Sequence, residues 1–312
     1  MSDVCDFPKY IQIQTTTRCG ARCRMCPHPS ASRSWPNGPM DEALFRNILA
    51  QCRGQAVKRI CPYLMADPLC DARIFDRIRH IRSVLPDVEI EVSTTPQMLV
   101  PARHGDLLAA PLTELRISSH GITEEDYRLL MPGVRYETAW PNFCAFIAKW
   151  REVQPYALCI VSLYGVLPPE RERAIADHWE KQGIRLERWR VTSRGGRIDL
   201  DQFDTVPDPT DWPRARREPP YACRFARDTE WMHILSDGRV TLCCMDYHQE
   251  VILGDLQDQT LMEVWTGDVF AGVRDRIAKG TSHTDNFLCE RCEWYVSESV
   301  LRAKSLQTAD VS

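Results

Sequence analysis

Residues 19–27 read Cys19-Gly-Ala-Arg-Cys23-Arg-Met-Cys26-Pro, which places three cysteines in the spacing Cys-x3-Cys-x2-Cys. Just before them, residues 10–15 alternate apolar and polar side chains, and this period of two predicts a strand. Three thiolates this close together can hold three irons of a cubane cluster and leave the fourth iron without a protein ligand. A site closed by four cysteines only passes electrons, so the free iron indicates a reactive centre at the C-terminal end of a strand.

Zinc is the alternative occupant of this loop. A zinc site normally takes four protein ligands, often as two Cys-x2-Cys pairs, and the loop offers three cysteines with His28 as a possible fourth ligand. The spacing favours iron.

Composition limits the compartment and the partners. The 312 residues carry a net charge of −4, with 44% hydrophobic and 26% charged residues, as is typical of globular proteins. This balance argues against bulk binding of nucleic acid or of an anionic membrane. The sequence shows neither an apolar run of transmembrane length nor a signal peptide, so we expect a cytoplasmic protein whose fourteen cysteines hold metal rather than disulfides.

Strand and helix patterns alternate over the first two thirds of the chain. Strands are predicted at residues 10–15, 57–61, 88–93, 114–118, 157–163 and 185–191. Helices are predicted between them, at residues 40–52, 71–85, 123–131, 140–147 and 168–182. Six strands alternating with helices imply an α/β fold with a parallel sheet, here a partial (β/α)6 barrel of the TIM type, over residues 8–198.

The alternation of predicted strands and helices ends after Gly195-Gly196. Residues 199–222 are rich in Asp and Pro and predict a linker. A small α+β module is expected over residues 223–296, with a hairpin of strands 231–235 and 239–245 and helices near 261–265 and 270–278. Residues 297–312 are expected to form a C-terminal tail.

A second cysteine group lies in this module. It comprises Cys223, Cys243 and the compact pair Cys289-Glu-Arg-Cys292, which can hold one side of a metal centre. A structural zinc ribbon is the alternative interpretation.

At these residues the sequence resembles the radical S-adenosylmethionine superfamily, in its members with a twitch domain, a shortened SPASM extension. The resemblance implies that Cys19, Cys23 and Cys26 hold a 4Fe-4S cluster whose open iron binds S-adenosylmethionine. It also implies reductive cleavage of that cofactor to a 5′-deoxyadenosyl radical, which abstracts hydrogen from a carbon. A second, auxiliary 4Fe-4S cluster is then held by Cys223, Cys243, Cys289 and Cys292.

The resemblance also assigns contacts with the cofactor. Met65-Ala66-Asp67-Pro68 stands where the family has Gly-Gly-Glu-Pro, so Asp67 is expected to accept from the methionine ammonium group. Ser93 and Thr95, after the third strand, are placed for the ribose, and Ser118 ends the fourth strand. Arg194 is expected to pair with the cofactor carboxylate. The alternative for the hydroxyl side chains is a role in turns or caps.

Cys244 directly follows Cys243. Side chains alternate along a strand, so if Cys243 faces the auxiliary cluster, Cys244 faces the opposite side, towards the barrel mouth. A free thiol there can give a hydrogen atom to a substrate radical. Packing is the alternative role.

These features predict a radical enzyme that acts on a small molecule of sugar or aminocyclitol type and inverts a carbon, with Cys244 as the hydrogen donor. Dehydrogenation of an alcohol with the auxiliary cluster as electron acceptor is the alternative. Modification of a ribosomal peptide is a further alternative function. Only about nine residues precede the first strand, so no leader-binding domain is expected, and this favours a small-molecule substrate. The last alternative function is a non-enzymatic sensor that binds an iron–sulfur cluster or zinc. The resemblance further implies a reductase, flavodoxin or ferredoxin as electron donor.

Overall fold

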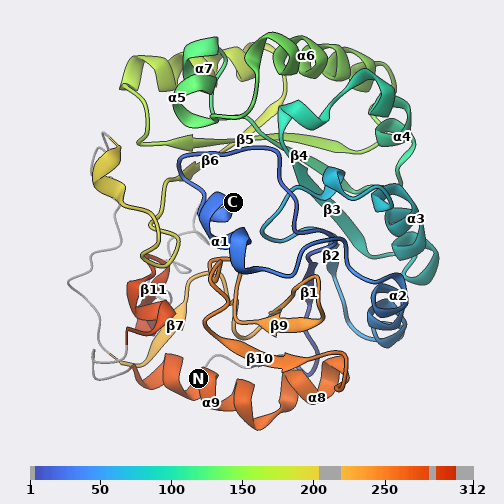
Figure 1. Cartoon of the computed structure of the whole chain (residues 1–312), viewed down its shortest axis with the longest axis vertical. Helices are drawn as coiled ribbons and strands as arrows, with labels where there is room; N and C mark the ends of the chain where they lie inside the picture. Colours follow the sequence, from blue (N-terminus) through green and yellow to red (C-terminus); the bar gives the residue numbers. More distant parts are fainter. Residues whose placement is uncertain (1–3, 204–218, 281–285, 300–312) are drawn as a thin grey trace.

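The computed structural model describes residues 4–203, 219–280 and 286–299. Six parallel strands that follow one another in sequence order form its centre, and Figure 1 shows them as an open arc with helices along the outer side. The strands are β1 Tyr10–Ile13, β2 Arg59–Cys61, β3 Glu89–Thr94, β4 Glu114–Ser118, β5 Ala157–Tyr164 and β6 Arg185–Arg190. The predicted α/β fold with a partial parallel barrel is therefore confirmed.

The helices of the barrel are α2 Glu42–Gln51, α3 Ile74–Val84, α4 His104–Ala109, α5 Glu124–Leu130, α6 Tyr136–Val153 and α7 Pro169–Lys181. Local caps fix two of the starts. The Asp41 side chain accepts from the backbone N–H of Leu44 at 3.0 Å, and Thr123 begins α5 with a complete capping box.

The predicted start of α3 at Asp71 is wrong by three residues. The carboxylate of Asp71 lies 3.0 Å from the guanidinium of Arg77, whose side chain is fully buried. Arg77 also donates to the Thr15 carbonyl, just after β1. One carboxylate oxygen of Asp71 therefore neutralises a buried cation, and the other accepts from the N–H of Arg73, just before the helix, at 3.0 Å. The ion pair fixes α3 against the loop that follows β1.

The two faces of the central sheet differ in chemistry. Ile11, Ile60, Ile90, Leu115 and Ile160 are fully buried on the face covered by helices, and burial of each contributes about 1.5–3 kcal/mol. The positions next to these buried residues along the same strands include many polar or charged side chains. Since side chains alternate across a strand, these polar positions line the concave face of the arc.

The C-terminal part continues the same sheet. Its strands are β7 Tyr221–Cys223, β8 Trp231–Ile234, β9 Arg239–Thr241, β10 Ile252–Asp255 and β11 Tyr295–Ser297, with helices α8 Leu261–Thr266 and α9 Asp268–Lys279. Strand β8 pairs in parallel with β1, and β9 and β10 follow antiparallel, so the sheet has nine strands among the described residues. Strands β7 and β11 pair separately.

Two predicted segments fall largely outside the described residues. These are the linker at 199–222, of which 204–218 are not described, and the tail at 297–312, of which 300–312 are not described. The predicted domain boundaries stay predictions.

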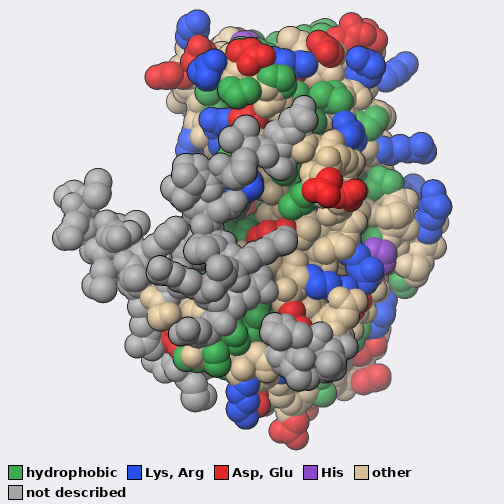
Figure 2. All heavy atoms as spheres, turned by 90° about the vertical axis from the view of Figure 1, so that its left-hand side faces the viewer, with side chains coloured by type: hydrophobic (Ala, Val, Ile, Leu, Met, Phe, Trp, Pro, Cys, Tyr) green, Lys and Arg blue, Asp and Glu red, His purple; other side chains and the backbone are tan. Residues whose placement is uncertain are grey.

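The surface is charged and mixed in sign. Figure 2 shows Lys and Arg interspersed with Asp and Glu on the face it presents, in keeping with the small net charge. In the part of the chain that the structure describes, every helix is too short or too polar to cross a bilayer.

Candidate functional site

The first cysteine group follows β1 and comes together in space. The backbone N–H of Cys26 donates to the Cys23 carbonyl at 3.0 Å. Burial, with smaller contributions from Asp67 and Cys26, raises the pKa of the Cys19 thiol to about 12. Burial, followed by Cys26 and Cys19, also raises the pKa of Cys23. Two desolvated thiols beside a third in one loop are unfavourable as bare thiolates, and a bound cationic cluster offsets that cost, so these residues fit an iron–sulfur cluster.

Backbone hydrogen bonds hold this loop in place. The N–H groups of Arg22 and Arg24 donate to the carbonyls of Pro132, just after α5, and Leu130, the last residue of α5. The N–H of Asp67, in the loop after β2, donates to the Arg18 carbonyl at 3.1 Å. The loop is therefore positioned by segments from two other parts of the barrel.

Asp67 has a structural role that the sequence did not reveal. Its buried carboxylate accepts from the Thr94 hydroxyl, from the N–H and hydroxyl of Thr95 and from the N–H of Leu69, at distances of 2.8–3.1 Å. The structure thus brings Asp67 and Thr95, both predicted cofactor contacts, against each other. They join the loop after β2 to the end of β3.

We expect Asp67→Asn to lower the free energy of unfolding by about 1–3 kcal/mol, because the amide presents a donor where donors already converge. The midpoint of urea unfolding measures this loss. Asp258→Asn is the control, since Asp258 is exposed and should change stability by less than about 0.5 kcal/mol. Unchanged stability of Asp67→Asn with a raised KM for S-adenosylmethionine would instead assign Asp67 to the cofactor alone.

The predicted cofactor contacts Ser93 and Ser118 lie on neighbouring strands of the barrel. Ser93 on β3 and Ser118 on β4 are half-buried and occupy the alternate positions that also carry Glu91 and Arg116. They therefore share the concave face.

Arg194 lies where the two cysteine groups approach each other. Its guanidinium donates to the Met245 sulfur at 3.5 Å. Burial lowers the pKa of Arg194, but the neighbouring Tyr247, Cys26 and Cys244 outweigh it, so the pKa is raised. The predicted cation is therefore held beside Cys26, in a left-handed turn with φ of 51°.

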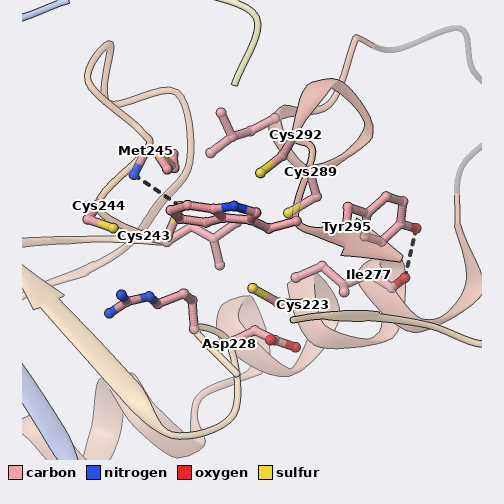
Figure 3. Close-up of a pocket in the computed structure, with 13 residues that line it drawn as sticks. Cys223, Asp228, Cys243, Cys244, Met245, Ile277, Cys289, Cys292 and Tyr295 are labelled. Carbon is pink, nitrogen blue, oxygen red and sulfur yellow. Dashed lines mark hydrogen bonds between the residues drawn. The ribbon is translucent and has the colours of Figure 1, made fainter. Parts of the chain in front are cut away.

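The second cysteine group lines a small cavity of about 30 Å³. Figure 3 shows Cys223, Cys243 and the pair Cys289 and Cys292 around it, with Cys244 next to Cys243. Burial is the main cause that raises the pKa of Cys223 to about 11 and of Cys292 to about 12. Over the described residues, no three His, Cys, Asp or Glu side chains converge on one ion position. Thiols spread around a space fit a polynuclear cluster better than a single zinc ion.

The predicted strand 239–245 is too long, and this corrects the argument from strand alternation. Strand β9 ends at Thr241 because the buried Asp246 carboxylate accepts from the Thr241 hydroxyl and from the N–H groups of Glu250 and Val251. Cys243 and Cys244 lie in the turn that follows, and both line the same cavity. They do not face opposite sides of a strand.

Cys244 shares one set of neighbours with the first cysteine group. It packs, together with Cys26, against one small apolar cluster that comprises Ala31, Trp35, Leu64, Met65, Leu235 and Tyr247. Cys244 thus lines the second cysteine group's cavity and also contacts the cluster on which Cys26 packs.

Sequence reasoning missed two buried residues at this junction. The Tyr247 hydroxyl lies 3.6 Å from the Cys26 sulfur. His120 follows β4, and burial together with Arg194 lowers its pKa to about 4, so its imidazole is neutral at pH 7. Its place directly after a strand was the available signal, whereas Tyr247 gave none beyond its proximity in sequence to Cys243.

Comparison with known proteins assigns the C-terminal part. Residues 223–293 match the SPASM family, an iron-sulfur cluster-binding domain. The S-adenosyl-L-methionine-dependent 2-deoxy-scyllo-inosamine dehydrogenase of Niallia circulans is 21% identical over 284 residues, which cover 90% of this chain and 91% of that protein.

Solved structures share the whole fold. BtrN in complex with AdoMet and 2-DOIA superposes with a TM-score of 0.58 and 16% identity, covering 92% of this chain and 93% of BtrN. Streptococcus suis SuiB bound to the precursor peptide SuiA gives a TM-score of 0.68 and 16% identity, covering 93% of this chain and 71% of SuiB. At these identities the likeness shows a common fold.

Proposed function

We propose that this chain is a radical S-adenosylmethionine enzyme with a SPASM iron–sulfur domain, and that it inverts a carbon of a sugar or aminocyclitol. The observation that carries the proposal is the place of Cys244. It packs on the same apolar cluster as Cys26, while four other cysteines remain to hold the auxiliary cluster.

The assignment of cofactors to residues follows the two cysteine groups. Cys19, Cys23 and Cys26 hold the cluster that binds S-adenosylmethionine, and Cys223, Cys243, Cys289 and Cys292 hold the auxiliary cluster. When bound, the first cluster supplies the electron that cleaves S-adenosylmethionine to methionine and a 5′-deoxyadenosyl radical. Arg194, buried beside Cys26, is placed to pair with the methionine carboxylate.

Cys244 completes the inversion. Hydrogen abstraction leaves 5′-deoxyadenosine and a substrate carbon radical, and the S–H bond of Cys244 breaks as a new C–H bond forms on the opposite face of that carbon. The resulting Cys244 thiyl radical takes one electron and one proton to restore the thiol. The electron comes from reduced flavodoxin or ferredoxin and the proton from water, and the substrate is neither oxidised nor reduced.

The concave face of the barrel supports a polar substrate. The Glu91 carboxylate accepts from the Tyr63 hydroxyl and, at 2.7 Å, from the Arg59 guanidinium. Arg116 continues this charged layer to Glu187, 2.7 Å away on β6. This layer of buried and half-buried charges on β2, β3, β4 and β6 suits a ligand with hydroxyl or amino groups better than an apolar one.

Dehydrogenation is the second candidate, and the similarity to the dehydrogenase of Niallia circulans favours it. In that reaction the substrate radical at an alcohol carbon loses one electron and one proton to give a ketone. The auxiliary cysteine group provides the place for the electron acceptor.

The test is anaerobic turnover of the reconstituted enzyme with S-adenosylmethionine, a reductant and a panel of aminocyclitols, amino sugars and peptides. We expect an aminocyclitol or amino sugar to raise 5′-deoxyadenosine formation above the substrate-free background and to give a product of unchanged mass. A product lighter by two hydrogen atoms would identify a dehydrogenase. Stimulation by peptides alone would contradict the proposed substrate class.

A further inference from the structure

The geometry points to Tyr247 as a residue that sets the reduction potential of the S-adenosylmethionine-binding cluster through a hydrogen bond to Cys26. The Tyr247 hydroxyl oxygen lies 3.6 Å from the Cys26 sulfur and accepts from its thiol. A cluster-bound Cys26 is a thiolate with no proton to donate, so the hydroxyl then becomes the donor. This inference rests on the proposed assignment of Cys26 as a cluster ligand. It concerns a side chain that the C-terminal part contributes to the N-terminal centre.

The hydroxyl group of Tyr247 is held in a defined position. Only 7% of the residue is exposed, and its ring stacks on Trp35 with 6.3 Å between ring centroids. The Trp35 indole N–H donates to the Tyr247 carbonyl at 3.0 Å. Trp35 itself follows the cysteine loop and packs edge-on against His28 at 5.4 Å. Trp35 therefore connects Tyr247 to the segment that follows the cysteine loop, and this contact holds the Tyr247 hydroxyl near the Cys26 sulfur.

Electrostatics at this position favour added negative charge on the cluster. A donor to a ligand sulfur stabilises the reduced, more negative form more than the oxidised form, and hydrogen bonds to sulfur are one determinant of cluster potentials. Arg194, whose guanidinium lies among Cys26, Tyr247 and Cys244, acts in the same direction. Loss of the Tyr247 hydroxyl is thus expected to make the potential more negative.

The contact also links the two cysteine groups. Tyr247 is only four residues after Cys243, and the intervening turn is fixed by the hydrogen bonds of Asp246. The turn that carries an auxiliary ligand therefore also carries the donor to Cys26. The SPASM domain in this way adjusts the centre that cleaves the cofactor.

The experiment compares Tyr247→Phe with the wild type and with Tyr156→Phe as a matched control. Tyr156 is also 7% exposed and donates its hydroxyl hydrogen to a distant carbonyl, that of Leu107, at 3.0 Å. The readout is a redox titration of the full protein, followed by electron paramagnetic resonance. The signal that changes on addition of S-adenosylmethionine identifies the cofactor-binding cluster.

We expect Tyr247→Phe to lower the ratio of reduced to oxidised cofactor-binding cluster about tenfold at a fixed potential, a shift of about 59 mV for one electron. The auxiliary cluster, the iron content and Tyr156→Phe should remain as in the wild type. A shift no larger than that of Tyr156→Phe, or a shift confined to the auxiliary cluster, would overturn the inference. Cys26→Ala separates this from a failed assignment, because retention of the cofactor-binding cluster in that variant would show that Cys26 is not a ligand.

Discussion

Alanine at Cys19, Cys23 and Cys26 together is expected to reduce cleavage of S-adenosylmethionine to the protein-free background. Burial desolvates the Cys19 and Cys23 thiols, and the three cysteines lie in one loop beside Asp67 and Arg194, where the described residues offer no second group of this kind. Iron should fall from about eight to about four per chain, because the auxiliary cluster keeps its own four ligands. Iron and sulfide analysis and chromatography of 5′-deoxyadenosine measure the two effects.

The control for this variant is Cys144→Ala. Cys144 is exposed on α6 and lines neither cysteine group, so its removal should leave both iron content and cofactor cleavage unchanged. The assignment fails if the triple variant retains about eight irons, or if it still forms 5′-deoxyadenosine at the wild-type rate.

Cys244→Ala is expected to uncouple hydrogen abstraction from product formation. 5′-Deoxyadenosine should still form with substrate, because the first cysteine group is intact, but the inverted product should be lost since no thiol returns the hydrogen atom. Iron content should remain at about eight per chain. Chiral or two-dimensional NMR analysis of the product and quantification of 5′-deoxyadenosine give the ratio between the two reactions.

Cys70→Ala provides the matched control for Cys244→Ala. Cys70 is also a half-buried thiol near the first group, 3.9 Å from the Met98 sulfur, and its removal should preserve inversion. Loss of iron in Cys244→Ala would make Cys244 a cluster ligand. Continued inversion in that variant would exclude it as the hydrogen donor.

The parts of the fold that depend on local signals were predictable from the sequence. The apolar run of residues 157–163 predicted β5 to within one residue, and the capping box at Thr123 predicted the start of α5. The start of α3 was predicted too early, at Asp71, because the ion-pair partner of Asp71, Arg77, is buried only once α3 packs on the sheet. Strand β9 was predicted too long, since the turn that ends it depends on the Asp246 carboxylate.

The candidate site was predictable where ligands are close in sequence. Cys19, Cys23 and Cys26 are grouped by spacing alone, but their approach to Arg194 and Tyr247 depends on chain segments about 170 and 220 residues away. The pairing of β8 with β1 creates this junction, and a parallel pairing over that separation leaves no local pattern. The sequence therefore predicted the two cysteine groups but not the side chains between them.

Turnover in deuterium oxide tests the central claim most directly. A thiol exchanges its proton with solvent, so hydrogen delivered by Cys244 originates from water. We predict one solvent deuterium at the inverted carbon of the product and none at other carbons, as read by mass spectrometry and NMR. An inverted product without deuterium, or a ketone as the sole product, would contradict the account.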